Sequence, residues 1–212
     1  MVQRFLGRLL GAAVAVAAIV LVAPAAAADE APDALIKRLS TEVLDAIKAD
    51  KQIQAGNLSR VVALVDQRIM PSVNFQRMTS AAVGRHWRQA TPEQQTRLQA
   101  EFKILLVRTY SGALAQVSDQ SIAMKPMRAA PEDKEVVVRT EVRGHGDPIQ
   151  LDYRLEKTPG QGAGWRIYDL NVLGVWLVET YRGQFAQEVS AKGIDGLIAT
   201  LSERNKTNAK KG

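Results

Sequence analysis

Few side chains in the sequence have the types and spacing that chemistry needs. The two histidines, His86 and His145, have no acidic residue at a spacing typical of a metal site. The chain has no cysteine, which excludes thiol catalysis and cysteine-ligated metals. The motifs G-x-S-x-G, H-E-x-x-H and G-x-x-x-x-G-K-[ST] do not occur. The sequence therefore predicts no catalytic residue, no metal and no cofactor.

Two features still allow a chemical interpretation. Asp169 is an acidic residue within an apolar stretch, where it is either a hydrogen-bonded structural carboxylate or a catalytic base. Gly160, Gly162 and Gly164 resemble a phosphate-binding loop. These glycines join two predicted strands and do not begin a helix, so the sequence favours a hairpin.

The first 28 residues have the composition of a secretory signal peptide. Arg4 and Arg8 form a basic region, residues 9–22 are apolar, and residues 25–28 are alanines suited to cleavage. The apolar run is too short to cross a bilayer comfortably, which takes about 20 residues. We therefore expect residues 29–212 to be exported to the periplasm as a single domain.

The net charge of +6 is a mild basic excess. It is compatible with anionic lipid surfaces or acidic partners, and it is not the signature of a nucleic-acid-binding protein. Part of the excess comes from a basic C-terminal tail, residues 204–211, which we expect to be solvated.

The first half of the chain has helical periodicity. Apolar residues recur at three- and four-residue steps, which predicts helices over residues 32–50, 57–70 and 74–83. Thr91, Pro92 and Gln94 then form a capping-box start. The helix that follows has an apolar side from Leu98 to Val117, and we expect it to cover a whole sheet.

The second half begins with alternating residues, which predict strands around 122–124, 136–142, 149–155 and 165–172. Short turns make these strands antiparallel. An amphipathic helix is expected from Val175, and a last one carries Ile194 to Leu201. The predicted fold is α+β, a twisted four-stranded antiparallel sheet curled against several helices. The space between them is either packed core or an apolar cavity, which periodicity does not decide.

Two segments resemble a known family. Residues 91–114, TPEQQTRLQAEFKILLVRTYSGAL, and residues 165–185, WRIYDLNVLGVWLVETYRGQF, are similar to the MlaC, or toluene-tolerance, family of periplasmic phospholipid carriers. The similarity extends over nearly the whole exported chain. It implies a carrier and not an enzyme, with phospholipid acyl chains enclosed in an apolar cavity.

The resemblance also implies partners. Members of the family shuttle phospholipid between an inner-membrane ABC transporter complex with an MCE-domain ring and an outer-membrane lipoprotein associated with porin, so transient contact with membrane surfaces is expected. Trp176 stands where the family tends to have a small or hydroxyl residue. Alternatives are a hopanoid-carrying relative, a periplasmic α+β enzyme acting on a small apolar substrate with Asp169 as base, and a structural adaptor.

The expected contacts with lipid follow from periodicity together with the resemblance. The predicted lining residues are Phe102, Leu105, Leu106, Tyr110, Val138, Leu151, Tyr153, Val175, Trp176, Tyr181 and Phe185. The cations Lys103, Arg108 and Arg182 are candidates for contact with the lipid head group or with a partner. A solvated helix face is the alternative for each of these cations.

Overall fold

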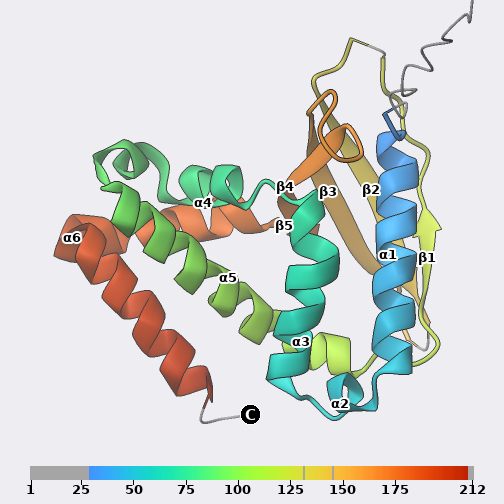
Figure 1. The fold of residues 1–212 in the computed structure, drawn as a ribbon, viewed down its shortest axis with the longest axis horizontal. Helices are drawn as coiled ribbons and strands as arrows, with labels where there is room; N and C mark the ends of the chain where they lie inside the picture. The colour runs from blue at the N-terminus through green and yellow to red at the C-terminus, as the bar shows by residue number, and fades with distance from the viewer. Residues whose placement is uncertain (1–28, 131, 145, 210–212) are drawn as a thin grey trace, which may run out of the picture.

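The computed structural model describes residues 29–130, 132–144 and 146–209. The predicted signal peptide, His145 and residues 210–212 lie outside this range. The described chain is α+β, with a sheet beside one helix and further helices extending away from one edge of the sheet (Figure 1). Among the described residues, no helix is both long enough and apolar enough for a bilayer crossing.

The sheet is antiparallel, with its strands in chain order. The strands are β1 (Ser121–Met124), β2 (Glu135–Arg143), β3 (Ile149–Lys157), β4 (Trp165–Val172) and β5 (Val175–Trp176). The prediction of four strands was therefore wrong. Val175 and Trp176, which we expected to begin a helix, turn back and pair with Val172 and Asn171.

Helix α1 (Pro32–Ala49) covers one face of the sheet, here called the inner face. Pro32 at the first helical position and Asp33 in the first turn favour a helix start here. The buried Leu35, Ile36 and Leu39 pack with Val136, Val138, Leu155 and their neighbours in one cluster, the sheet cluster. Residues of β2 and β3 between these positions point to the opposite, outer face.

A set of short helices follows α1. These are α2 (Lys51–Gln54), α3 (Leu58–Leu64), the π-helix η1 (Val65–Ile69) and the 3-10 turn η2 (Met70–Ser72). Asn57 caps α3 by accepting a hydrogen bond from the Arg60 backbone N–H at 3.2 Å. The continuous helix predicted over 57–70 is thus an α-helix that widens into a π-helix. Ile47, Ile53, Val61 and Leu64 form a third apolar cluster with Val107.

The remaining helices form a unit that we call the helical arm. It consists of α4 (Phe75–Val83), η3 (Gly84–Gln89), α5 (Pro92–Ala115) and α6 (Leu177–Ala209). The predicted capping box at Thr91 and Gln94 is confirmed. Helix α6 bends at Gly193, whose φ of 70° interrupts the helical backbone, and it includes residues 204–209 of the predicted tail.

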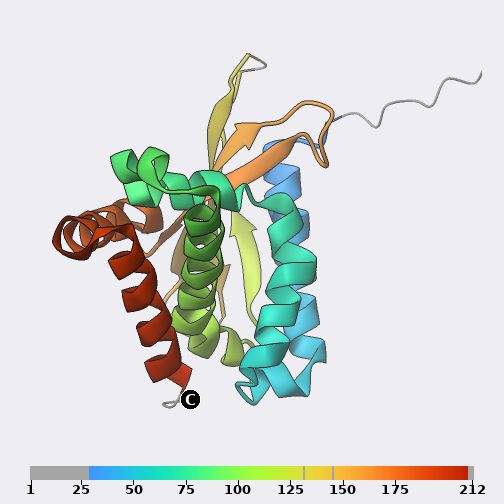
Figure 2. The ribbon, with the colours of Figure 1, turned by 60° about the vertical axis from the view of Figure 1, so that its left-hand side comes forward.

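The arm has its own core, the arm cluster. Phe75, Phe102, Tyr181 and Phe185 pack with ring centroids 4.9–5.7 Å apart. Figure 2 shows α5 between α6 and α3, and these helices are its main neighbours. The expectation that α5 covers the whole sheet was therefore wrong, because α4 and α6 take up one side of its apolar surface.

Candidate functional site

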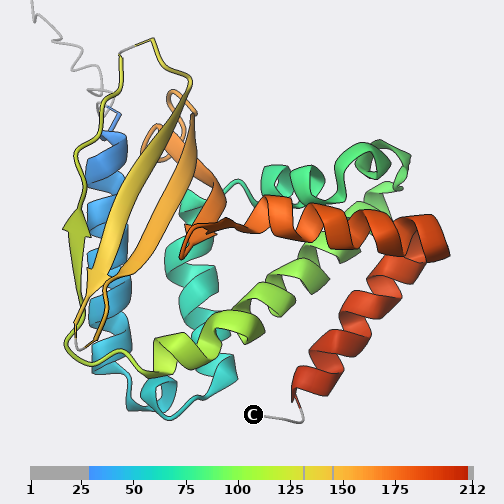
Figure 3. The ribbon, with the colours of Figure 1, turned by 180° about the vertical axis from the view of Figure 1, so that it is seen from behind.

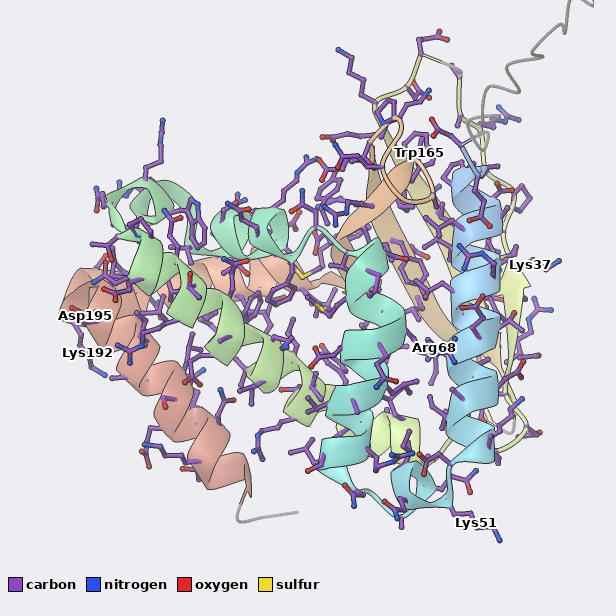
Figure 4. The ribbon with its side chains drawn as sticks, in the orientation of Figure 1. Lys37, Lys51, Arg68, Trp165, Lys192 and Asp195 are labelled. Atoms are coloured by element: carbon purple, nitrogen blue, oxygen red, sulfur yellow. The ribbon has the colours of Figure 1, made fainter. Side chains whose placement is uncertain are left out.

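The inner face of the sheet is unevenly covered along the strands. At the end near the start of β2, Val136, Leu155 and Ile167 lie opposite one another and are at most 7% exposed. Trp165 belongs to the same end and lies near the start of α1 (Figure 4). We call this the closed end of the inner face.

Exposure rises stepwise toward the other end of the same face. Val138 and Tyr153 are buried, and their neighbour Leu170 is partly exposed. In the next row, Leu151 and Val172 are both partly exposed, while Thr140, which pairs with Leu151, is buried. Ile149 and Val175 complete the face and are 43% and 53% exposed. We call Leu151, Val172, Ile149 and Val175 the open end, which leaves apolar surface accessible where the closed end leaves almost none.

The interior consists of three apolar clusters that meet through partly exposed residues. Val73 and Leu170 each pack against both the arm cluster and the sheet cluster, and Val43 packs against both the sheet cluster and the third cluster. Leu106 and Tyr110 of α5 border the arm cluster and are also partly exposed. Partly exposed apolar side chains therefore lie at the borders between neighbouring clusters.

The structure divides the predicted lining residues between two of these clusters. Phe102, Leu105, Tyr181 and Phe185 are buried in the arm cluster, with Leu106 and Tyr110 at its border. Val138, Leu151 and Tyr153 lie on the inner face of the sheet. Close aromatic packing marks Phe102, Tyr181 and Phe185 as core of the arm, while the partly exposed members are better placed to line a site.

The tyrosines of this set stay uncharged near neutral pH. Burial raises the pKa of Tyr110, Tyr153 and Tyr181 above the ordinary tyrosine value of 10.0. The Tyr153 hydroxyl lies 3.5 Å from Oγ of Ser40 on α1. These groups therefore add neutral polar atoms to an apolar interior and no negative charge.

Val175 and Trp176 are neighbours in sequence but lie on opposite faces of the sheet. Val175 pairs with Val172 and shares the inner face with it. Trp176 pairs with Asn171 on the outer face, where the Arg154 guanidinium stacks 3.8 Å from the indole ring. Trp176 therefore supports the outer face, and the geometry separates it from the other predicted lining residues.

The three predicted head-group cations do not converge on one place. Nζ of Lys103 forms an ion pair with Asp66 at 2.8 Å, which links α5 to η1. Nε of Arg182 donates to the backbone oxygen of Ala81 at 3.0 Å, near the end of α4. Nε of Arg108 is buried without a hydrogen-bond partner in the described part of the chain. Lys103 and Arg182 thus hold helices together, and contact with a ligand stays a prediction for all three.

Asp169 has the surroundings of a structural carboxylate. Its Oδ1 accepts hydrogen bonds from the backbone N–H groups of Leu170 at 2.9 Å and Val178 at 3.1 Å, and its Oδ2 pairs with Arg154 at 3.0 Å. Burial is the main reason that the pKa of Asp169 is raised. Its side chain is 1% exposed, so it holds the first turn of α6 against β4 and has no route to a substrate.

The remaining features considered as chemical sites are structural in this fold. Gly160, Gly162 and Gly164 lie in the turn between β3 and β4, as the hairpin interpretation expected. Nδ1 of His86 lies 3.3 Å from Oε1 of Gln89 within η3. No group of acidic or histidine side chains within the described ranges is arranged to hold a metal ion.

Neither Leu170 nor Val172 was among the lining residues predicted from the sequence. Leu155 pairs with Ile167, but Arg154 pairs with Asp169, so Tyr168 is an extra residue in β4. This β-bulge reverses the alternation of β4, because two residues of one strand then oppose one of the other. A strict period of two from Ile167 places Asp169 on the inner face, whereas the fold places Leu170 there.

Two pockets lie away from the predicted lining residues. The larger, of about 610 Å³, lies between the end of α1, α2 and α3 and is lined in part by Lys51 and Arg68 (Figure 4). The other, of about 400 Å³, lies along β2 and includes Val137 and Arg139 of the outer face. The predicted apolar cavity is not among these two pockets.

Comparison with known proteins gives close similarities. A solved structure of the phospholipid-binding protein from Ralstonia solanacearum, in complex with a phospholipid, is 50% identical with a TM-score of 0.80, covering 84% of this chain and 98% of that chain. The toluene tolerance protein ttg2D of Pseudomonas putida is 28% identical over 79% of this chain and 77% of its own length.

A third relative is similar over most of the length of both chains. The intermembrane phospholipid transport system binding protein MlaC of Haemophilus influenzae is 23% identical over 86% of both chains. The family model described as MlaC protein matches residues 37–203, which include every helix and strand from most of α1 to most of α6. The chain therefore belongs to the MlaC family.

Proposed function

We propose that this protein binds phospholipid and that the acyl chains lie against the open end of the inner face. The observation that carries the proposal is the stepwise rise in exposure from Leu155, at 0%, to Ile149, at 43%, along one strand. Both residues are large and aliphatic and both belong to the same face. Apolar surface left open beside a packed core is typical of a ligand site.

The chemistry of the neighbouring side chains supports an apolar ligand. Leu106 and Tyr110 of α5, Val43 of α1 and Leu170 of β4 are partly exposed apolar residues at the borders of the clusters. Two acyl chains of about 16 carbons cost on the order of 25 kcal/mol to expose to water, at about 0.8 kcal/mol per methylene. A carrier must offset nearly all of this cost, which requires an extended apolar surface rather than a few contacts.

The relatives support the same class of ligand. A member that is 50% identical has been solved in complex with a phospholipid, and another is named as the binding protein of an intermembrane phospholipid transport system. We therefore propose a periplasmic carrier that moves phospholipid between the inner and outer membranes with an ABC transporter complex. The signal-peptide composition of residues 1–28 supports export.

The site also favours binding over catalysis. Asp169, the acid considered as a base, is buried and engaged by Arg154 and two backbone N–H groups. An apolar surface with neutral tyrosine hydroxyls offers no group that changes its charge during a reaction near neutral pH. We propose that the protein is a carrier and not an enzyme.

Native mass spectrometry of the exported protein, purified without detergent, tests the proposal. We expect a species heavier than the protein by the mass of one or more phospholipids, and the same lipids in an organic extract. Leu151→Glu, at the open end, should abolish the heavier species. Val137→Glu, on the outer face of the same sheet, is the matched control and should keep it. Wild-type protein that carries no lipid after gentle purification would contradict the proposal.

A further inference from the structure

The exposed large apolar side chains of the described residues all lie at one corner of the sheet. They are Ile149, Leu173 and Val175, at 43%, 65% and 53% exposed. The backbone N–H of Leu173 donates to the oxygen of Gln150 at 3.0 Å, which brings the turn between β4 and β5 beside the start of β3. Figure 3 shows this turn where the sheet meets the helical arm.

Leu173 has an unusual backbone conformation for its side chain. Its φ of 53° is in the left-handed region, which glycine and asparagine adopt readily and leucine rarely does. Two hydrogen bonds hold the turn in this shape. One is the bond from the Leu173 N–H to Gln150, and in the other Asn171 Oδ1 accepts from the Gly174 N–H at 2.9 Å. The geometry of the turn does not favour leucine at this position, and the Leu173 side chain is mostly exposed to solvent.

The corner continues the open end of the inner face. Val175 lies opposite Val172, Val172 lies opposite Leu151, and Ile149 is two residues from Leu151 on the same face. An apolar surface therefore runs from the partly exposed Leu151 to the exposed Leu173, and no charged residue of the inner face interrupts it. Exposure increases along this path, as expected for the entrance to a site rather than for its floor.

We infer that Ile149, Leu173 and Val175 form the rim over which a phospholipid acyl chain passes when the lipid is taken up or released. The inference rests on the proposed lipid-binding function. The rim shields the chain from water during transfer, because the Leu173 side chain is held outward by the strained turn. Leu173, which lies outside the open end, acts on the rate of exchange and contributes little to the affinity for lipid once the lipid is bound.

The test is the transfer of a fluorescent phospholipid between donor and acceptor vesicles of phosphatidylcholine and phosphatidylglycerol. In Leu173→Asn the turn keeps a residue that tolerates the left-handed region, so the variant should unfold at the same or a higher temperature than wild type. Loss of the leucine contact should slow transfer roughly five- to tenfold. Val137→Asn, on the outer face, should transfer at the wild-type rate.

The outcomes separate this inference from the proposed function. If wild type transfers lipid and Leu173→Asn is equally fast, the rim is wrong while lipid binding stands. If wild type neither binds nor transfers lipid, the proposed function fails and the rim with it. Should Leu173→Asn not fold, Ile149→Asn and Val175→Asn leave the Leu173 turn unchanged, and wild-type transfer rates in both would overturn the inference. Slow transfer in Leu173→Asn with unchanged bound lipid would support it, because Leu173 lies outside the open end.

Discussion

The closed and open ends of the inner face share strands β3 and β4 and both contain large aliphatic residues, yet only the closed end is packed. Leu35, Ile36 and Leu39 of α1 cover the closed end. Farther along α1, the buried Ile47 packs in the third cluster and not on the sheet. Alternation in a strand therefore predicts which side chains face an apolar space, but this alternation does not predict whether other side chains fill that space.

The largest expected effect is at the closed end. Leu155→Ala should lower the free energy of unfolding by about 2 to 5 kcal/mol, because it removes a fully buried side chain from a packed cluster. Urea unfolding followed by circular dichroism measures the change. A loss below about 1 kcal/mol would mean that the closed end is not packed and that the two ends do not differ.

A smaller effect is expected where the sheet joins the arm. Asp169→Ala leaves the buried N–H of Val178 without its acceptor and removes the closer of the two carboxylates that pair with Arg154, so unfolding should become easier by about 1 to 3 kcal/mol. Asp169→Asn retains one acceptor oxygen and should lose less. If both variants lost transfer activity while keeping wild-type stability, the structural role of Asp169 would be contradicted.

A substitution at the open end should cost less stability than one at the closed end, and it should reduce the amount of bound lipid. Leu151→Ala should cost only about 1 kcal/mol in lipid-free protein, because Leu151 is already partly exposed. The same change should reduce the phospholipid that co-purifies, measured by extraction and phosphorus analysis. Leu155→Ala serves as the comparison, and equal losses of stability in the two variants would remove the distinction between the ends.

The smallest effect concerns the outer face and depends on pH. Hydrogen bonds from Arg77 and then Tyr168 lower the pKa of Glu135 below 4.5. A carboxyl group with a lowered pKa in the folded state adds stability above its unfolded pKa, and this contribution is lost as pH falls through the folded pKa. Glu135→Gln should therefore be less stable than wild type at pH 7, by less than about 1 kcal/mol because Glu135 is exposed, and equally stable near pH 3.

Denaturant midpoints at several pH values measure this difference, with Glu132→Gln on the adjoining loop as control. The control should have the wild-type midpoint at pH 7. A constant difference between Glu135→Gln and wild type at every pH would contradict the role of the Arg77 ion pair.

Much of the fold followed from local patterns. The capping box at Thr91, the helix ends at Asp50 and Gly84, and the hairpins between β2, β3 and β4 were predicted from residue types whose conformational preferences act over a few positions. Those preferences need no knowledge of distant contacts.

The errors came from features that depend on distant partners. The bulge at Tyr168 depends on Arg77 and Glu135, which hold that side chain on the outer face. The two-residue strand β5 depends on β4, and a continuous apolar run from Val175 looked like a helix start without it. The candidate site lies where these two features meet, so sequence periodicity placed Val138, Leu151 and Tyr153 on the inner face and missed Leu170 and Leu173.

The most direct test of lipid binding at the open end uses a phospholipid with a photoactivatable group in its acyl chain. After irradiation of the loaded protein, peptide mass spectrometry locates the crosslinks. Crosslinks are expected at the open end, on Leu151, Val172 and their neighbours, with almost none on Leu155 or on the outer-face residue Val137. Crosslinks spread over the outer face, or confined to the two surface pockets, would contradict it.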